Sequence, residues 1–204
     1  LVHAKCDAEV CSVRPALEAG NVSLLTRSQV KRLTTDASGR KVTGVELERD
    51  GEPLTFTAEI VVVSCGAANS ARLLLMSAND KHPHGLANSS DQVGRNYMFH
   101  NSKAMVALSH EPNLTTFQKT VCINDWYFGG DDFDYPMGNI QMTGKTNGEI
   151  MKGYAPLETF LMPGWSMDKI AEHAVDFWLS SEDLPDPGNR VTVDAKGQIT
   201  LNYT

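Results

Sequence analysis

The sequence predicts a mixed α/β (α+β) fold, and three observations support this prediction. Residues 21–58 hold three strand-like segments separated by turn residues, which is typical of a β-meander. Residues 60–76 run from an apolar strand through a turn of small residues into a helix, a unit typical of parallel sheets. Residues 102–204 mix short strand candidates with Gly-rich and Asp-rich turns, so the second part is predicted to be mostly β.

The first element is predicted to be a helix over residues 7–19. Val10, Val13 and Leu17 recur there at helical spacing, and Gly20 follows as a C-cap.

The β-meander follows this helix. Residues 21–33 are predicted to form a long strand, and the segment 41–51 alternates apolar and polar residues as a half-buried strand does. Asp50 and Gly51 form a strong hairpin signal, so residues 53–58 are predicted to return as the third strand.

The most informative stretch begins at the apolar run 60–63, which predicts a strand buried on both faces. Small residues occupy 64–68, and Asn69 or Ser70 is predicted to cap the helix that follows. Backbone N–H groups at such a turn, together with the helix dipole, favour phosphate oxygens. The pattern is equally that of an ordinary β-turn-α unit, and no glycines here have the G-x-G-x-x-G spacing.

The second part is predicted to contain a helix around 166–174 and two strands across the turn 195–197. A polar, loop-like composition over 79–95 marks the best candidate boundary between two domains. No internal repeat and no low-complexity segment appears in either part.

Composition and charge limit the classes of partner. The 204 residues include 18 Lys and Arg against 25 Asp and Glu, a net charge of −7. This argues against nucleic acid or an anionic membrane as the main partner, since both bind largely through cations. No apolar run is long enough for a membrane span. The chain begins without Met or a signal peptide, and we expect it to be a segment of a longer chain.

The four cysteines, at positions 6, 11, 65 and 122, match no known disulfide scaffold. Cys6 and Cys11 have no second ligand pair, so a zinc site is not expected. We expect all four to be free thiols.

Several segments resemble the glucose–methanol–choline (GMC) oxidoreductases, which are FAD-dependent alcohol oxidases and dehydrogenases. Residues 57–78 look like the second signature of that family. The block DQVGRNYMFH at 91–100 is similar to its Val-Gly-Arg-Asn block, and 182–194 resembles its Glu-x-x-Pro…Asn-Arg-Val segment. The strands within 21–47 match the pair that precedes the signature. These blocks keep the order of the family and span nearly the whole chain.

This resemblance implies part of a Rossmann-like FAD-binding domain with a β-meander, followed by part of an antiparallel-sheet substrate domain. Residues 1–90 would be the C-terminal part of the first domain and residues 91–204 the N-terminal part of the second. The Gly-rich FAD motif and the catalytic His of the family lie outside these residues. The resemblance therefore assigns no catalytic residue and no metal ligand within this chain.

The implied reaction is oxidation of a CH–OH group in an alcohol, sugar or polyol. In the family, a His takes the hydroxyl proton while hydride passes to N5 of the flavin. The expected cofactor is FAD, the expected partner is a small alcohol or sugar, and the electron acceptor is left open. Ala71 stands where the signature usually has Pro, which places the chain nearer the bacterial choline- or sugar-acid-dehydrogenase-like members.

The resemblance also implies cofactor contacts. Val30 matches the valine whose backbone meets the adenine end of FAD, while Ser64, Cys65, Gly66 and Ala67 match the small-residue turn beside the cofactor. From the residues alone, Val30 is equally an inward strand residue, and Cys65 is more simply a small buried filler.

Other chemistry-bearing residues have simpler interpretations. His100 is expected to anchor a loop near the domain boundary, and the carboxylates around Glu182 are expected to be solvated or paired with Arg190. Trp126 and Phe133, with the aromatics near them, are candidates for the lining of a substrate pocket, but packing in the core of the β part is the expectation. The alternative to an oxidoreductase is a non-catalytic α/β binding module without flavin.

Overall fold

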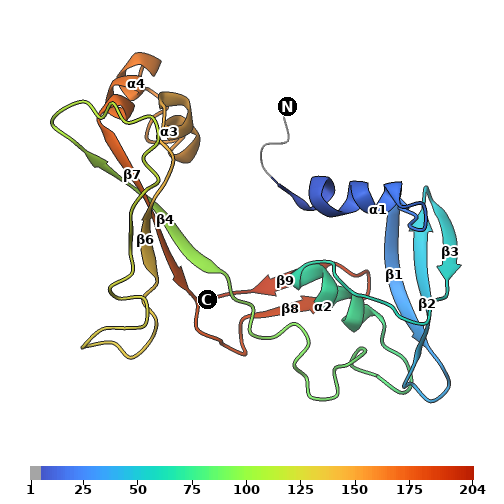
Figure 1. The fold of residues 1–204 in the computed structure, drawn as a ribbon. Coiled ribbons are helices and arrows are strands. Elements are labelled where there is room, and N and C mark those ends of the chain that lie inside the picture. The colour runs from blue at the N-terminus through green and yellow to red at the C-terminus, as the bar shows by residue number, and fades with distance from the viewer. Residues whose placement is uncertain (1–5) are drawn as a thin grey trace. The chain divides into compact units, whose positions relative to one another are not determined.

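The computed structural model describes residues 6–204, which divide into two units. Residues 98–186 form the second unit, and the remaining residues form the first. The segment 187–204 thus packs with the first unit, whereas the sequence prediction grouped 91–204 together. The predicted domain division at 90/91 stays a prediction. The mixed α/β class is confirmed, with helices and antiparallel sheets in the chain (Figure 1).

The first unit opens with a helical run and a three-stranded meander. The helical run contains a π-helical turn, Glu9–Val13, and α1, Arg14–Glu18, as the sequence predicts. The antiparallel sheet has the order β1-β2-β3 and comprises Ser28–Thr35, Val42–Arg49 and Glu52–Phe56. The hairpin turn predicted at Asp50 and Gly51 is present, and both residues have positive φ.

The core of the first unit lies between this sheet and α2, Ala67–Met76. Leu33 of β1, Leu73 of α2 and Leu86 of the following loop are buried together. Ser77 is fully buried beside them, where its Oγ accepts the Leu33 N–H at 2.9 Å and donates to the Leu73 carbonyl at 2.6 Å. This hydroxyl joins the end of α2 to β1 in place of a backbone ladder.

Two strand predictions in the first unit are wrong for the described residues. Residues 21–27 form no strand, and β1 begins only at Ser28. Residues 60–63 are extended but have no strand partner, and burial alternates along them. Val61 and Val63 pack on the core, whereas Ile60 and Val62 are 81% and 80% exposed. A strand needs a hydrogen-bonded neighbour, and none of the described residues supplies one here.

The first unit is completed by the hairpin of β8, Arg190–Val193, and β9, Ile199–Asn202. This pair is the one predicted across 195–197. Strand β8 lies against α2, and the Arg72 side chain of α2 donates to the Gly197 carbonyl at 2.7 Å.

The two segments that carried the family resemblance in this region lie against each other. The Val191 N–H donates to the Gly94 carbonyl at 2.7 Å, and the Tyr97 N–H donates to the Asn189 carbonyl at 2.8 Å. A Cβ on Gly94 would lie 2.6 Å from the Val191 carbonyl oxygen, so only glycine allows this approach. The segments 91–97 and 189–191 therefore form a structural joint of the first unit.

Asp91 strengthens this joint. Its carboxylate bonds to the guanidinium of Arg95 and lies 3.3 Å from that of Arg190. The hydrogen bond from Arg95, aided by the positive charge of Arg95 and Arg190, lowers the pKa of Asp91 from its ordinary value of 3.8.

We expect Asp91→Asn to lower the thermal midpoint of the protein at pH 7. Because the pKa of Asp91 is lower in the folded state, its contribution is present above the ordinary aspartate pKa and is lost as the pH falls through the folded pKa. Melting curves between pH 2 and pH 7 should therefore show the wild type and the variant converging at the acid end, by the two-state linkage relation. Asp80→Asn, at an exposed side chain, is the control. A difference that stays constant down to the acid end would contradict this role.

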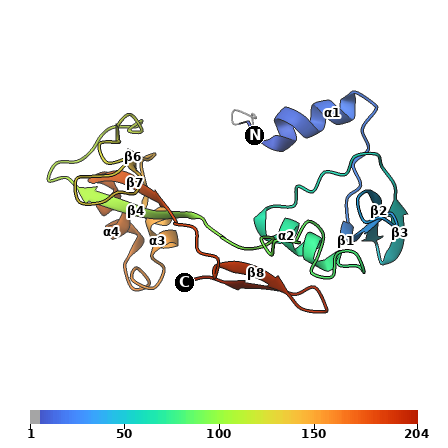
Figure 2. The same cartoon turned by 90° about the horizontal axis from the view of Figure 1, so that it is seen from below.

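The second unit is built on a four-stranded antiparallel sheet with the order β4-β7-β6-β5. Its strands are β4, His100–Leu108; β5, Cys122–Ile123; β6, Asn139–Met142; and β7, Ala174–Glu182. Helices α3, Gly148–Tyr154, and α4, Gly164–Glu172, pack against each other beside this sheet (Figure 2). The helix predicted at 166–174 corresponds to α4, whereas α3 was not predicted.

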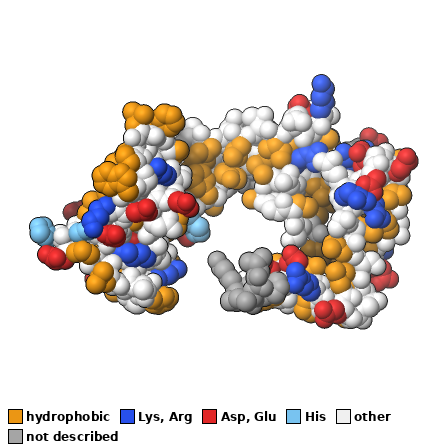
Figure 3. All heavy atoms as spheres, turned by 90° about the horizontal axis from the view of Figure 1, so that it is seen from above, with side chains coloured by type: hydrophobic (Ala, Val, Ile, Leu, Met, Phe, Trp, Pro, Cys, Tyr) orange, Lys and Arg blue, Asp and Glu red, His pale blue; other side chains and the backbone are white. Residues whose placement is uncertain are grey.

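Exposed apolar side chains occur on both units (Figure 3). In the second unit they include Leu157, Phe160 and Leu161, between α3 and α4, which are each more than 80% exposed. Trp126 is 53% exposed and Phe133 46%, so the prediction that these aromatics pack in a core is wrong. No helix among residues 6–204 has the length and apolar character needed to cross a membrane.

Cys6 and Cys11 form a disulfide, which corrects the expectation that all four cysteines are free. Cys65 and Cys122 are free and exposed. Exposure also corrects the interpretation of Cys65 as a buried filler. Within the described part of the chain, no cluster of three or more His, Cys, Asp or Glu side chains is arranged to hold a metal ion.

Candidate functional site

The predicted cofactor turn lies at the start of α2. The helix begins at Ala67 with Gly66 as its N-cap, so the predicted caps Asn69 and Ser70 lie inside the helix instead. Ser70 still orders the turn, because its Oγ accepts the Cys65 N–H at 3.0 Å and its N–H donates to the Gly66 carbonyl at 2.9 Å. The turn is thus held from within the helix rather than by a capping side chain.

Gly66 is the residue that this turn requires. Its φ of 78° and ψ of 166° fall in a region that is essentially limited to glycine. A Cβ added there would meet no atom within 4 Å, so the backbone faces open space. Glycine is needed at this position for its conformation, and the neighbouring space is free for another molecule.

The first turn of α2 presents unpaired backbone donors. In residues 6–204, the N–H groups of Ala67, Ala68 and Asn69 have no hydrogen-bond acceptor, and no side chain caps them. Such amides, at the positive end of a helix of ten residues, bind anionic oxygens. The turn at Ser64, with its small neighbours up to Ala67, therefore has the donors and the open space that a dinucleotide phosphate requires.

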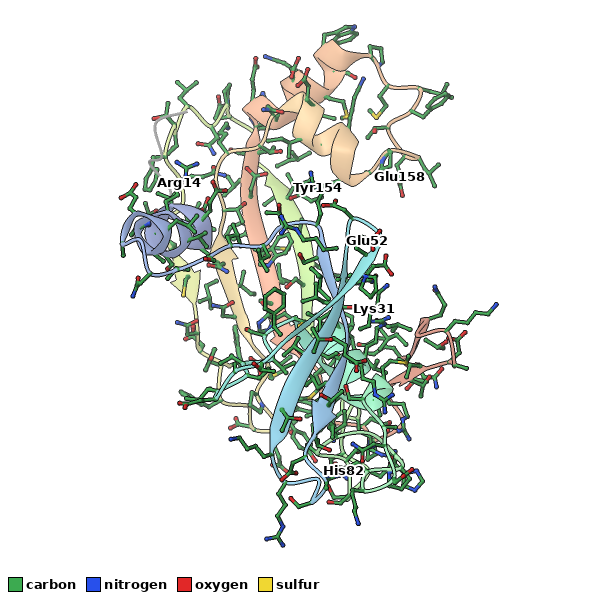
Figure 4. All side chains as sticks on the ribbon, turned by 90° about the vertical axis from the view of Figure 1, so that its right-hand side faces the viewer. Arg14, Lys31, Glu52, His82, Tyr154 and Glu158 are labelled. Atoms are coloured by element: carbon green, nitrogen blue, oxygen red, sulfur yellow. A yellow bond between two sulfur atoms is a disulfide. The ribbon has the colours of Figure 1, made fainter. Side chains whose placement is uncertain are left out.

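Val30 lies on β1 and packs, half-buried, on the same core cluster as α2. A β-bulge follows it, since Val30 pairs with Leu47 and Arg32 with Glu46, so that Lys31, labelled in Figure 4, falls outside the backbone register. The Nζ of Lys31 lies 3.4 Å from a carboxylate oxygen of Glu48 on β2. The structure thus packs Val30 and helix α2 on one core, whereas residues 64–67 of the turn are exposed. The Val30 side chain has the inward position of an ordinary strand residue, and the Val30 backbone lies next to the β-bulge.

The second unit holds a cavity of about 530 Å³ on its sheet. Its lining comes from β4, β7, β6, β5 and the loop between β5 and β6, and includes His100, Lys103, Trp126 and Leu179. Sequence reasoning weighed Trp126 as a pocket residue but favoured the core, and it did not single out Lys103. No local signal marks Lys103, because the sheet register alone brings it to this cavity.

His100 stands at the start of β4, with its Nδ1 3.8 Å from the nearest carboxylate oxygen of Glu182. Its side chain is 71% exposed. Asp183 accepts from the Asn101 side chain and the Phe99 N–H, while the Arg190 guanidinium lies 3.3 Å from the carboxylate of Asp91. The contacts of Asp183 order the beginning of β4, and the Glu182 side chain is 73% exposed, as expected for a solvated carboxylate.

Residues 2–102 match the family model of the GMC oxidoreductases. Over 175 residues the chain is 28% identical to the fructose dehydrogenase large subunit of Gluconobacter japonicus. This alignment covers 83% of this chain and 32% of that protein. Over 193 residues it is 26% identical to 2-methyl-1,2-propanediol dehydrogenase of Mycolicibacterium austroafricanum. This alignment covers 88% of this chain and 34% of that protein.

A third relative is the oxygen-dependent choline dehydrogenase of Staphylococcus saprophyticus, 28% identical over 130 residues, or 57% of this chain and 22% of that protein. The chain spans about a third of the length of the first two relatives. The matched family model and these relatives together show that the chain belongs to the GMC oxidoreductase family.

Proposed function

We propose that this chain is part of an FAD-dependent oxidoreductase that acts on the CH–OH group of an alcohol, sugar or polyol. Members of the GMC family bind FAD, and their N-terminal domain is the FAD-binding part. The observation that carries the proposal is the α2 turn, with three unpaired amides beside the open side of Gly66. The relatives named above act on a sugar, a diol and choline, which supports a hydroxyl-bearing substrate.

In this proposal Ser64, Cys65, Gly66 and Ala67 form the wall next to the cofactor, and the backbone of Val30 meets its adenine end. The amides at the start of α2 would donate to phosphate oxygens, while Ser70 keeps the turn in place through Cys65. When bound, the flavin supplies the hydride acceptor for alcohol oxidation. We assign no catalytic base to residues 1–204, in keeping with a His elsewhere in the whole protein.

The sheet of the second unit is proposed to face the substrate. Its cavity is lined by large apolar side chains and a few polar groups, a composition typical of small-molecule sites. The reaction would then need the turn of the first unit for the cofactor and the cavity of the second for the alcohol.

The absorbance spectrum of the full-length natural protein tests this function. We expect flavin bands that bleach when an alcohol or sugar substrate is added without an electron acceptor. Residues 1–204 alone are expected to oxidise no alcohol and to retain little FAD. A full-length protein that purifies without flavin, and that does not bind added FAD, would instead support the non-catalytic binding module.

A further inference from the structure

The register of the second sheet places one cation in a row of apolar side chains. Lys103 of β4 pairs with Leu179 of β7, Leu179 pairs with Ile140 of β6, and Ile140 pairs with Ile123 of β5. Residues that pair laterally point to the same face of a sheet. All four residues line the 530 Å³ cavity, together with Ser102, Ser180 and Asn139 of the neighbouring row. Lys103 also lines a second cavity of about 590 Å³ in the same unit.

The rest of the lining is apolar or uncharged, apart from His100. Phe99, Trp126 and Met137 add large apolar side chains, and Asn101 adds an amide. No Asp or Glu of the described chain belongs to the lining. The ammonium group of Lys103 has no ion pair or hydrogen bond among residues 6–204, so its charge is not neutralised by a protein partner.

The carboxylates nearest in the fold have other positions or partners. Asp176 of β7 is three residues from Leu179, so it points to the opposite face, where its Oδ2 accepts from Gln118 Nε2 at 2.7 Å and from the Thr146 N–H at 3.1 Å. Asp183 accepts from Asn101 and Phe99, and Glu182 faces His100. The acidic residues of the loop between β5 and β6 do not line the cavity.

We propose that this cavity prefers alcohols whose remaining part is apolar and neutral or anionic over cationic alcohols, and that Lys103 determines this preference. The inference rests on the proposed function, because it takes the cavity as the substrate site of the oxidoreductase. Family membership does not make this choice, since the relatives include a choline dehydrogenase, whose substrate is a cation, and a fructose dehydrogenase, whose substrate is neutral. An unpaired ammonium group beside a mainly apolar lining repels a quaternary ammonium group at short range.

The test compares choline with 3,3-dimethyl-1-butanol, an alcohol of the same shape in which carbon replaces the charged nitrogen. Dissociation constants are measured by calorimetry on the full-length natural protein. We expect the neutral alcohol to bind about tenfold more tightly than choline, the order of effect of one unit charge at the edge of a protein site. Lys103→Met should remove most of this preference and Lys103→Glu should reverse it. Lys119→Met, at an exposed lysine outside the lining, should leave it unchanged.

Equal or tighter binding of choline by the wild type would overturn the inference, as would the absence of any binding of the neutral alcohol. A preference that persists in Lys103→Glu would overturn the role of Lys103. These binding results do not depend on turnover. If the protein shows the charge preference but carries no flavin, the proposed function fails while the charge selection of the cavity stands. If the flavin bleaches with choline as readily as with the neutral alcohol, the proposed function stands while the charge selection of the cavity fails.

Discussion

Gly138→Ala should disrupt the pairing of β6 with β7 and lower the free energy of unfolding of the second unit by on the order of 3–5 kcal/mol. Gly138 precedes β6 with a φ of +94°, and an added Cβ would lie 1.9 Å from the Ser180 carbonyl oxygen and 2.8 Å from the Ser181 Cα. Both atoms belong to the backbone of β7, so no side-chain rotation relieves the contact. Strand β6 would have to move away from β7, and the row from Ile123 to Lys103 would lose its register.

Limited proteolysis of the full-length protein, with the cleavage sites mapped by mass spectrometry, measures this effect. New cleavages are expected within 98–186, whereas the first unit keeps its resistance, since Gly138 belongs to the second unit. Gly144→Ala is the matched control, because it lies in the same unit and an added Cβ meets no atom within 4 Å. Equal protease resistance of the two variants would show that β6 yields at this point without loss of the sheet.

Comparison of the two sheets shows which parts of the fold can be predicted from the sequence. The meander of the first unit was predictable because alternation along β2 and the Asp50-Gly51 turn are local signals. The row from Lys103 to Ile123 was not, since it depends on pairing between strands that are far apart in the chain. Helix α3 was missed because it is short. Asn147 caps it locally, but the Gly148 N–H is held by Asp168 of α4, which is distant in the chain.

The candidate cofactor site likewise has features that the sequence predicts and features that it does not. The run of small residues at 64–67 predicted a tight turn into a helix, and the turn is present. The point where α2 begins was predicted too late, because polar residues at 69 and 70 resemble caps, whereas the unusual conformation of Gly66 starts the helix earlier. The strand predicted at 60–63 failed for a non-local reason. Its apolar composition predicts burial on both faces, and the described residues cover only the side of Val61 and Val63.

Gly66→Leu should abolish stable flavin binding by the full-length protein. The backbone at Gly66 has φ and ψ that a β-carbon disfavours by about 1–3 kcal/mol, and the new side chain would occupy the open space beside the turn. Relaxing that strain also reorients the unpaired amides of Ala67 and Ala68. Together these effects should weaken FAD binding by on the order of 100-fold, which equilibrium dialysis with flavin absorbance measures.

Gly51→Leu separates this effect from backbone strain. Gly51 also has a positive φ, +87°, and no atom within 4 Å of an added Cβ, but it lies in the turn between β2 and β3. Both variants should lose stability, because both place a side chain on a backbone suited to glycine. Only Gly66→Leu should lose flavin, since only that residue adjoins the helix amides. If both variants retain FAD equally, the α2 turn does not contact the cofactor. If both lose it equally, strain alone explains the loss, and the cofactor contact proposed for residues 64–67 has no support from this experiment.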